Sequence, residues 1–161
     1  MGFFGRVFGR RSTDAASALD RELADWRIVD AHNAAAGERA IFRIRMAKPA
    51  RKDLDYLVTA AVIKWPYQGQ MPPADVNQQQ LAFEKAIDPL TSEGGSELMQ
   101  VATGMSLKEW IFYARSADAF MARLNTLLSG RPRYPIEVEF HDDPTWKMWS
   151  QTVATLKARG A

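Results

Sequence analysis

Apolar and polar residues alternate along several short segments of the chain, a period of two that is typical of β-strands with one buried face. The clearest case is residues 39–46, whose two faces carry different side chains. One face is apolar and consists of Ala40, Phe42, Ile44 and Met46; the other carries Arg39, Arg43 and Arg45. With residues 26–31 and the turn-forming residues 33–37 before it, this segment predicts a β-hairpin. Four further strands are predicted at residues 54–65, 97–103, 108–114 and 136–140.

Other segments repeat their apolar residues every three or four positions, which is typical of amphipathic helices. One helix is predicted over residues 76–91, where Asp75 and Gln78 suggest a capping box at its start. Its inward stripe is Val76, Phe83, Ile87 and Leu90. A second helix is expected to start at a Ser116 cap and to end at Gly130.

The last apolar stripe predicts a C-terminal helix. Asp143 is expected to cap it and Pro144 to occupy its first position, since proline there loses no helical hydrogen bond. The predicted buried residues are Trp146, Trp149, Val153 and Leu156. A short lead-in helix is also expected over residues 13–23.

From residue 54 to residue 140 the predicted order is strand, helix, strand, strand, helix, strand. This order indicates an α+β fold with a ferredoxin-like split β-α-β-β-α-β core. The N-terminal β-hairpin is expected to extend the antiparallel sheet, and the C-terminal helix to pack on it. We therefore divide the chain into an N-terminal segment, residues 1–23, and a single α+β domain, residues 24–161.

Composition narrows the function classes. Hydrophobic residues make up 47% and charged residues 25% of the 161 residues, as in ordinary globular domains. The absence of cysteine excludes disulfides and thiolate sites, and it fits a cytoplasmic protein. The net charge is +2, but without three N-terminal arginines 18 basic residues face 19 acidic ones, so no nucleic-acid partner is expected.

The first eleven residues are basic and aromatic, and no run in the sequence is apolar enough to be a transmembrane segment. Such a segment can lie on an anionic membrane surface or contact a partner; the alternative, which we favour, is a frayed terminus. The candidate contact residues are Phe3, Phe4, Arg6, Phe8, Arg10 and Arg11.

Glu137, Glu139 and His141 alternate with apolar residues and therefore share one face of a predicted strand. Two carboxylates and an imidazole could bind a metal or perform acid–base chemistry. The alternative, which we favour, is a solvated or salt-bridged face, met across the sheet by Arg43 and Arg45.

Trp110 and Phe112 share a face of the strand over residues 108–114. RNA-recognition modules of this topology stack bases on aromatic residues of the corresponding strand. The glycines of that motif are missing and Glu109 adds a negative charge, so we favour core packing for both rings.

Three stretches of the chain form a recognisable set: Thr103-Gly104 with Trp110-Ile111-Phe112-Tyr113, then Pro135 to Glu139, and Asp143-Pro144-Thr145-Trp146 with Lys147-Met148-Trp149. Together these motifs resemble the bacterial family known as domain of unknown function 695. The resemblance extends from about Trp26 to Leu156 and includes Met71-Pro72 before the first helix; where the family often has tyrosine, this chain has Trp149. It implies a fold similar to a bacterial protein that inhibits ribonuclease E by protein contact, and no established activity.

The sequence thus favours a non-catalytic protein-interaction or regulatory domain with an unidentified protein partner and no cofactor. It contains no phosphate-binding loop, dinucleotide fingerprint or zinc-protease motif. Two alternatives stay open. One is a small-molecule or metal-dependent enzyme that uses the Glu137, Glu139 and His141 face; the other is a domain held on a membrane surface by residues 1–11.

Overall fold

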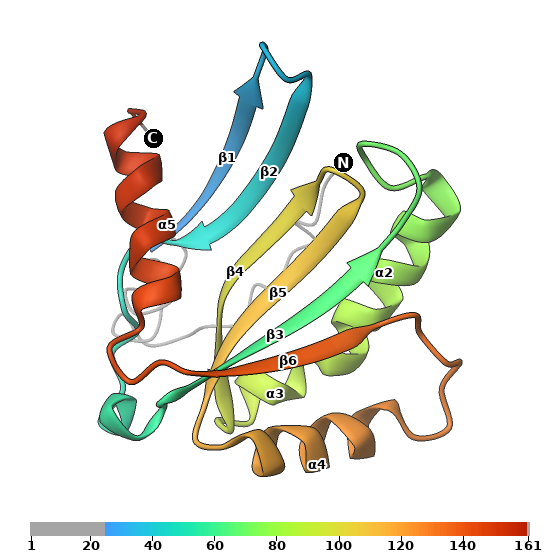
Figure 1. The fold of residues 1–161 in the computed structure, drawn as a ribbon. Helices are drawn as coiled ribbons and strands as arrows, with labels where there is room; N and C mark the ends of the chain where they lie inside the picture. Colours follow the sequence, from blue (N-terminus) through green and yellow to red (C-terminus); the bar gives the residue numbers. More distant parts are fainter. Residues whose placement is uncertain (1–24, 161) are drawn as a thin grey trace, which may run out of the picture.

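The alternating segments form one antiparallel sheet in the computed structural model, which describes residues 25–160. The six strands lie in the order β1-β2-β4-β5-β3-β6 (Figure 1). Their bounds are β1 (Trp26–Asn33), β2 (Glu38–Arg45), β3 (Thr59–Pro66), β4 (Ser96–Gly104), β5 (Leu107–Ala114) and β6 (Glu137–Asp142). The hairpin of β1 and β2 extends the sheet because β2 pairs with β4, as expected. The α+β class is confirmed.

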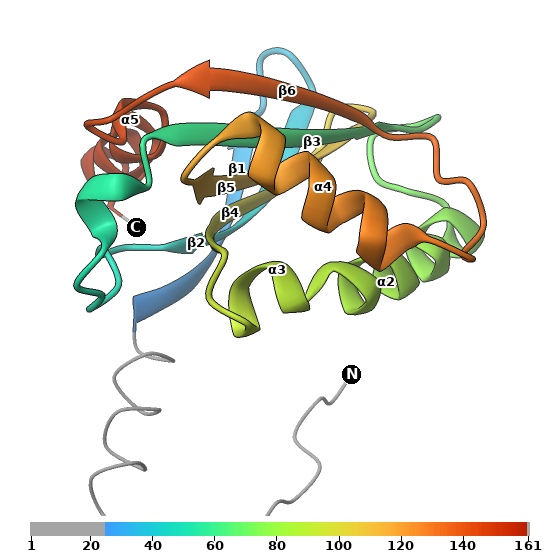
Figure 2. The same ribbon diagram turned by 90° about the horizontal axis from the view of Figure 1, so that it is seen from below.

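Helices cover both faces of this sheet (Figures 1 and 2). They are α2 (Ala74–Ile87), α3 (Pro89–Ser92), α4 (Ala117–Leu128) and α5 (Lys147–Ala158). The first three pack on one face and contribute residues such as Phe83, Leu90 and Leu124 to its apolar cluster. Helix α5 packs on the other face through Trp149, Val153 and Leu156. We call these the first face and the second face of the sheet.

Strict alternation along the central strands supplies both apolar clusters. In β5, Trp110 and Phe112 point to the first face, whereas Ile111 and Tyr113 point to the second. Because β3 and β5 are buried on both sides, their sequences are apolar almost throughout. A bulge between Leu98 and Gln100 shifts the register of β4 against β5.

Several predicted element boundaries are wrong, each for a local reason. Residues 54–56 form a 3-10 turn and not the start of a strand, since Tyr56 N and Leu57 N donate to Asp53 O and Leu54 O. The helix expected over residues 76–91 is divided at Asp88, because Pro89 begins a separate helix. Pro73 precedes α2 and no side chain caps it, so the predicted capping box does not form.

A further correction concerns the C-terminal helix, which begins at Lys147 rather than at Pro144. Trp146 stands before it in the left-handed region, with φ of 58°. Asp143 nevertheless binds the start of this helix, as expected of a cap, because its carboxylate accepts hydrogen bonds from Lys147 N and Met148 N. The Ser116 cap of α4 is confirmed by a hydrogen bond from Ala119 N to Ser116 Oγ.

The turn between β4 and β5 explains why a glycine precedes it. A Cβ on Gly104 would lie 2.2 Å from Arg39 O, so β2 approaches too closely for any side chain there. The two turn residues, Met105 and Ser106, both have positive φ, which gives the hairpin the twist of its strands.

The expected lead-in helix over residues 13–23 and the basic, aromatic residues 1–11 lie outside the described residues. Within residues 25–160, no helix has the length and apolar character needed to cross a membrane.

Candidate functional site

Glu137, Glu139 and His141 lie on the second face of β6, at one edge of the sheet. Lys64 of β3 donates to Glu139 Oε2 over 2.9 Å, and His141 Nε2 lies 3.7 Å from the same oxygen. The Lys64 hydrogen bond is the largest influence on Glu139 and holds the pKa of its carboxyl below the usual range. An ionised, ion-paired carboxylate of this kind is a poor general base.

The predicted meeting of Arg43 and Arg45 with these residues is wrong, because three strands separate β2 from β6. Arg43 lies 3.4 Å from Glu84 of α2, on the first face of the sheet. Arg45 is buried and lies 3.5 Å from Glu97 of β4. The predicted surface is therefore divided among separate parts of the molecule.

Trp110 and Phe112 are core residues, with 0% and 2% of their surfaces exposed. Trp110 Nε1 donates to Glu84 Oε1 over 3.0 Å, and Lys108 Nζ lies 3.0 Å from the same oxygen. Burial raises the pKa of Glu84, but the charges of Arg43 and Lys108 and these hydrogen bonds bring it below the ordinary value. Neither ring can stack on a nucleic-acid base.

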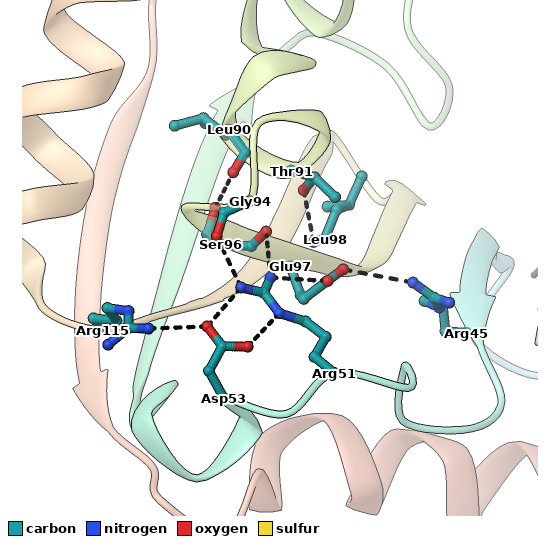
Figure 3. A network of polar contacts seen from close by, with 10 residues as sticks. All are labelled: Arg45, Arg51, Asp53, Leu90, Thr91, Gly94, Ser96, Glu97, Leu98 and Arg115. Carbon is teal, nitrogen blue, oxygen red and sulfur yellow. Dashed lines mark hydrogen bonds and ion pairs between the residues drawn. The ribbon is translucent and has the colours of Figure 1, made fainter.

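A network around Arg51 was not predicted from the sequence (Figure 3). The Arg51 guanidinium contacts both oxygens of Asp53, at 2.7 and 2.8 Å, and Glu97 Oε1 at 2.9 Å. It also donates to Gly94 O over 2.8 Å. Arg115 lies 3.0 Å from Asp53, and Arg45 approaches Glu97 from the opposite side. The network joins the loop after β2 to the start of β4 and the end of β5.

This network is suited to holding the chain together rather than to catalysis. The hydrogen bond from Arg51 is the main reason why the pKa of Asp53 is lowered. Nearby polar groups are also used internally, since Ser96 Oγ donates to Leu90 O and Thr91 Oγ1 accepts from Leu98 N (Figure 3). No sequence signal identifies it, because Arg51 and Glu97 are 46 residues apart.

A second unpredicted cluster lies under α5. The Tyr113 hydroxyl donates to Asp143 Oδ2 over 2.7 Å, and its ring stacks on Trp146 with centroids 4.2 Å apart. Trp146 Nε1 donates to Leu57 O, and Trp149 Nε1 to Arg45 O, each over 2.8 Å. The tryptophans of the Asp-Pro-Thr-Trp motif therefore have hydrogen-bonded, structural positions.

The surroundings of Asp143 and Tyr113 shift the pKa values of the two groups in opposite directions. Burial raises the pKa of Asp143, but hydrogen bonds from Met148 N, Tyr113 and Lys147 N outweigh it and lower the pKa overall. Burial, with the hydrogen bond to Asp143, raises the pKa of Tyr113 well above its ordinary value. The pair thus remains a carboxylate and a neutral phenol across the neutral pH range.

A groove of about 480 Å³ lies between β1 and the C-terminal end of α5. It is lined by the consecutive residues 27–32 of β1 and by Leu156, Arg159 and Gly160. Because side chains alternate between the faces of a strand, a groove that touches six consecutive residues follows the backbone edge. Strand β1 pairs only with β2 among the strands described, so this edge faces the groove.

The hydrogen-bond register shows which backbone groups point outward from β1. Met46 N donates to Asp25 O over 2.7 Å, which makes these two residues a hydrogen-bonded pair just outside the register of Trp26 with Arg45. Alternation along an antiparallel ladder then directs the N–H and C=O groups of every second residue away from β2. These residues are Trp26, Ile28, Asp30 and His32. The side chain of Ile28 is also strongly exposed, at 78%.

A second cavity of about 480 Å³ lies at the other end of the sheet, between the end of β3 and the start of α2. Trp65, Tyr67 and Val76 contribute apolar surface to it, and Asp75 is its carboxylate. The candidate site of this protein is the groove beside β1, because there a cavity coincides with an unpaired strand edge.

The part of the chain that the structure describes contains no group of three or more His, Cys, Asp or Glu residues arranged to hold a metal ion. Comparison with curated proteins finds no significant match. Comparison with protein-family models finds a match over residues 24–153, which covers the whole sheet and most of α5. The chain belongs to this family, DUF695, a family of unknown function.

Proposed function

We propose that this chain is a non-catalytic protein-interaction domain with a regulatory role. The observation that carries the proposal is the groove along the unpaired edge of β1, beside α5. An exposed sheet edge next to a cavity offers a partner both backbone hydrogen bonds and side-chain contacts. Arg27 and Ile28 supply charged and apolar contacts on the two sides of that edge.

The carboxylates of the described residues support a non-catalytic role, because their contacts are with other groups of the chain. Five carboxylates each bind groups of the chain itself: Asp30, Asp53, Glu84, Glu139 and Asp143. Each has a pKa below its ordinary value, so each is a weak proton acceptor near neutral pH. Asp30 lines the groove beside β1, but Arg39 binds both of its carboxylate oxygens.

The arrangement of the elements supports a ferredoxin-like core, which we propose for β3 to β6 with α2 and α4. Their strand order is β4-β5-β3-β6, and all neighbours are antiparallel. We further propose that residues 24–161 form one domain and that it acts in the cytoplasm, for which the cysteine-free sequence is the support. A likeness of fold does not carry a partner with it, so the partner has to be found by experiment.

The test is a pull-down of the tagged full chain at native level, with and without nuclease, followed by mass spectrometry. We expect a stoichiometric protein partner that survives nuclease treatment. Loss of all partners with nuclease would instead support an RNA-dependent interaction. A specific substrate turnover that is lost in Glu139→Gln or His141→Ala would overturn the proposal.

The two alternatives of the sequence analysis have less support. Glu139 and His141 are close together, but Lys64 forms an ion pair with the same Glu139 oxygen that His141 approaches. Metal analysis of untagged protein tests this alternative, and a stoichiometric metal would support it. Membrane tethering through Phe3, Phe4, Arg6, Phe8, Arg10 and Arg11 falls outside the described residues and stays a prediction. Liposome flotation with and without residues 1–11 tests it.

A further inference from the structure

The cavity between the end of β3 and the start of α2 has a different character from the groove beside β1. Its volume of about 480 Å³ is in the range of pockets that hold small organic molecules. We propose that it binds a small organic amine, with the cationic nitrogen at Asp75 and the apolar body of the molecule against the walls. This inference does not depend on the proposed interaction function, because the cavity and the groove share no lining residue.

Apolar side chains form most of the wall of this cavity. They come from the end of β3, the loop after it, the start of α2 and the loop before β6: Trp65, Pro66, Tyr67, Pro73, Val76 and Pro135. The Trp65 ring is fixed by Phe83 and Tyr134, whose ring centroids lie 5.7 and 5.5 Å away. Buried aromatic rings and prolines have little freedom to lose when a ligand binds, so this wall is suited to the apolar body of a small molecule.

Hydrogen bonds hold the loop that leads from β3 to α2 (Figure 1). Tyr67 N donates to Ser106 O, and Ser106 Oγ donates to Gly69 O, each over 2.9 Å. The Tyr67 hydroxyl donates to Gln70 O over 3.0 Å, within the same loop. The turn between β4 and β5 therefore fixes the loop that lines the cavity, and a ligand meets a wall that is already formed.

Charge decides which small molecules fit. Among the described residues that line the cavity, Asp75 alone carries a charge. Its side chain is exposed, and it has no hydrogen bond or ion pair with another described residue. This distinguishes it from Asp30 of the other groove, which Arg39 binds through both oxygens. A carboxylate without an internal partner is available to form charge-assisted hydrogen bonds with an ammonium group.

Gln79 adds a second acceptor beside Asp75. It follows Asp75 by four residues in α2, so the two side chains are neighbours on the helix surface, and both line the cavity. An ammonium group has three N–H donors, which the carboxylate and the amide oxygen can share. The start of a helix also attracts anions, but the Asp75 carboxylate already lies in the first turn of α2 and repels a second negative charge.

Three compounds of nearly equal size and different charge test the inference: phenethylamine, phenethyl alcohol and phenylacetate. The full chain is titrated with each compound, and binding is followed by the chemical shifts of the backbone amides. We expect phenethylamine to bind at least about tenfold more tightly than phenethyl alcohol, and phenylacetate to bind more weakly than both. The largest shifts are expected at Tyr67, Gln68, Asp75 and Gln79.

A matched pair of variants tests the carboxylate. Asp75→Asn should bring the affinity for phenethylamine to within about threefold of that for phenethyl alcohol, because the charge is lost and the shape is kept. Asp118→Asn is the control, since Asp118 is also an exposed residue at the second position of a helix, α4, and does not line the cavity. It should leave the preference for the amine unchanged.

A second pair places a competing ammonium group inside the cavity. Lysine at position 79 would stand four residues after Asp75 and pair with it, so Gln79→Lys should weaken phenethylamine binding about fivefold or more. Gln79→Met has a side chain of similar length without the charge, and it should retain most of the binding. The unfolding midpoint of each variant shows whether α2 is intact.

Several results would overturn the inference. They are equal binding of the three compounds, a preference for phenylacetate, binding of none of them at millimolar concentration, and an unchanged preference for the amine in Asp75→Asn. Shifts confined to residues 27–32 would place the compound in the groove beside β1 and would overturn it as well. The pull-down uses none of these compounds, so the interaction function and the amine site fail separately.

Discussion

The two faces of the sheet are stabilised in different ways. On the first face, α2, α3 and α4 cover a broad apolar cluster, and ring contacts such as Phe83 with Trp110 fill it. On the second face, the single helix α5 is fixed by hydrogen-bonded aromatic residues, above all Trp146 and Tyr113. Both faces therefore bury an apolar cluster, and the second face adds a few directional hydrogen bonds that fix its single helix.

This difference bears on function. A helix that is fixed by directional bonds near its N-terminal end, at Asp143 and Trp146, can leave its other end beside an open groove. The remainder of the second face carries half-buried and exposed polar residues, among them Lys64, Glu137 and Glu139. The second face thus includes the groove of the candidate site, whereas helices cover the centre of the first face.

The largest effect should come from removing the central residue under α5. Trp146→Ala is expected to lower the free energy of unfolding by about 3–5 kcal/mol, since a fully buried ring, its stack on Tyr113 and a hydrogen bond are all lost. Urea unfolding followed by circular dichroism measures it. Trp26→Ala serves as the matched control at a half-buried tryptophan, and an equal loss in both variants would contradict the special role of Trp146.

Asp143→Ala should cost about 2–3 kcal/mol, because the start of α5 loses its acceptor and the buried Tyr113 hydroxyl loses its partner. Asp143→Asn keeps one acceptor oxygen and should cost less. The same contacts predict a dependence on pH. The pKa of Asp143 is lowered in the folded state, so its stabilisation is full above about pH 4 and is lost as pH falls below that value.

Tyr113 sets the opposite limit of this pH dependence. Its pKa is raised in the folded state, so the unfolded chain ionises first and stability falls above about pH 10. Tyr113→Phe should flatten this alkaline fall relative to the original protein. Unfolding midpoints between pH 3 and pH 11 measure both limits, and an unchanged alkaline slope in Tyr113→Phe would contradict the assignment.

On the first face, the sharpest test is the partly buried carboxylate of Glu84. Glu84→Gln should lower the free energy of unfolding by about 2–3 kcal/mol, because the Lys108 ammonium is left buried without a counter-charge. The double variant with Lys108→Met should recover much of this loss. If the double variant is no more stable than the single one, the ion pair is not the cause.

Gln80 offers a smaller change in the opposite direction on the same face. Its side chain is fully buried, and neither its amide nitrogen nor its oxygen has a hydrogen-bond partner among the described residues. Gln80→Met should therefore raise the free energy of unfolding by about 1 kcal/mol, since an uncompensated polar group is removed from the core. A destabilisation measured by urea unfolding would indicate that an ordered water satisfies the amide.

The smallest effect is expected at the exposed part of the second face. Glu139→Gln and Lys64→Ala should each leave the unfolding midpoint nearly unchanged, since a solvent-exposed ion pair contributes little. A large shift in either variant would show that this edge of the sheet is held by charge. It would also weaken the contrast between α5, which is fixed by buried hydrogen bonds, and the exposed polar edge at β6.

Local pattern alone determined most of the secondary structure. Alternation or a continuous apolar run, together with turn-forming residues, identified all six strands. The Ser116 cap and the stripe from Trp146 to Leu156 were predicted directly from residue types and spacing. Each of these features depends on neighbours within a few residues. The boundaries that failed, at Leu54 and at Pro89, lie where turn hydrogen bonds or a missing N–H compete with a continuous apolar pattern.

Only the tertiary structure decided which side chains meet. Arg43 is paired with Glu84 rather than with Glu139, because strand order and not sequence order sets the neighbours across a sheet. The Arg51 network and the groove beside β1 each join residues far apart in the chain, so no local pattern indicates them. The sequence of β1 does not show that it is an edge strand. Among the described strands it pairs with β2 alone because the fold places it last in the sheet, and the end of α5 lies beside it.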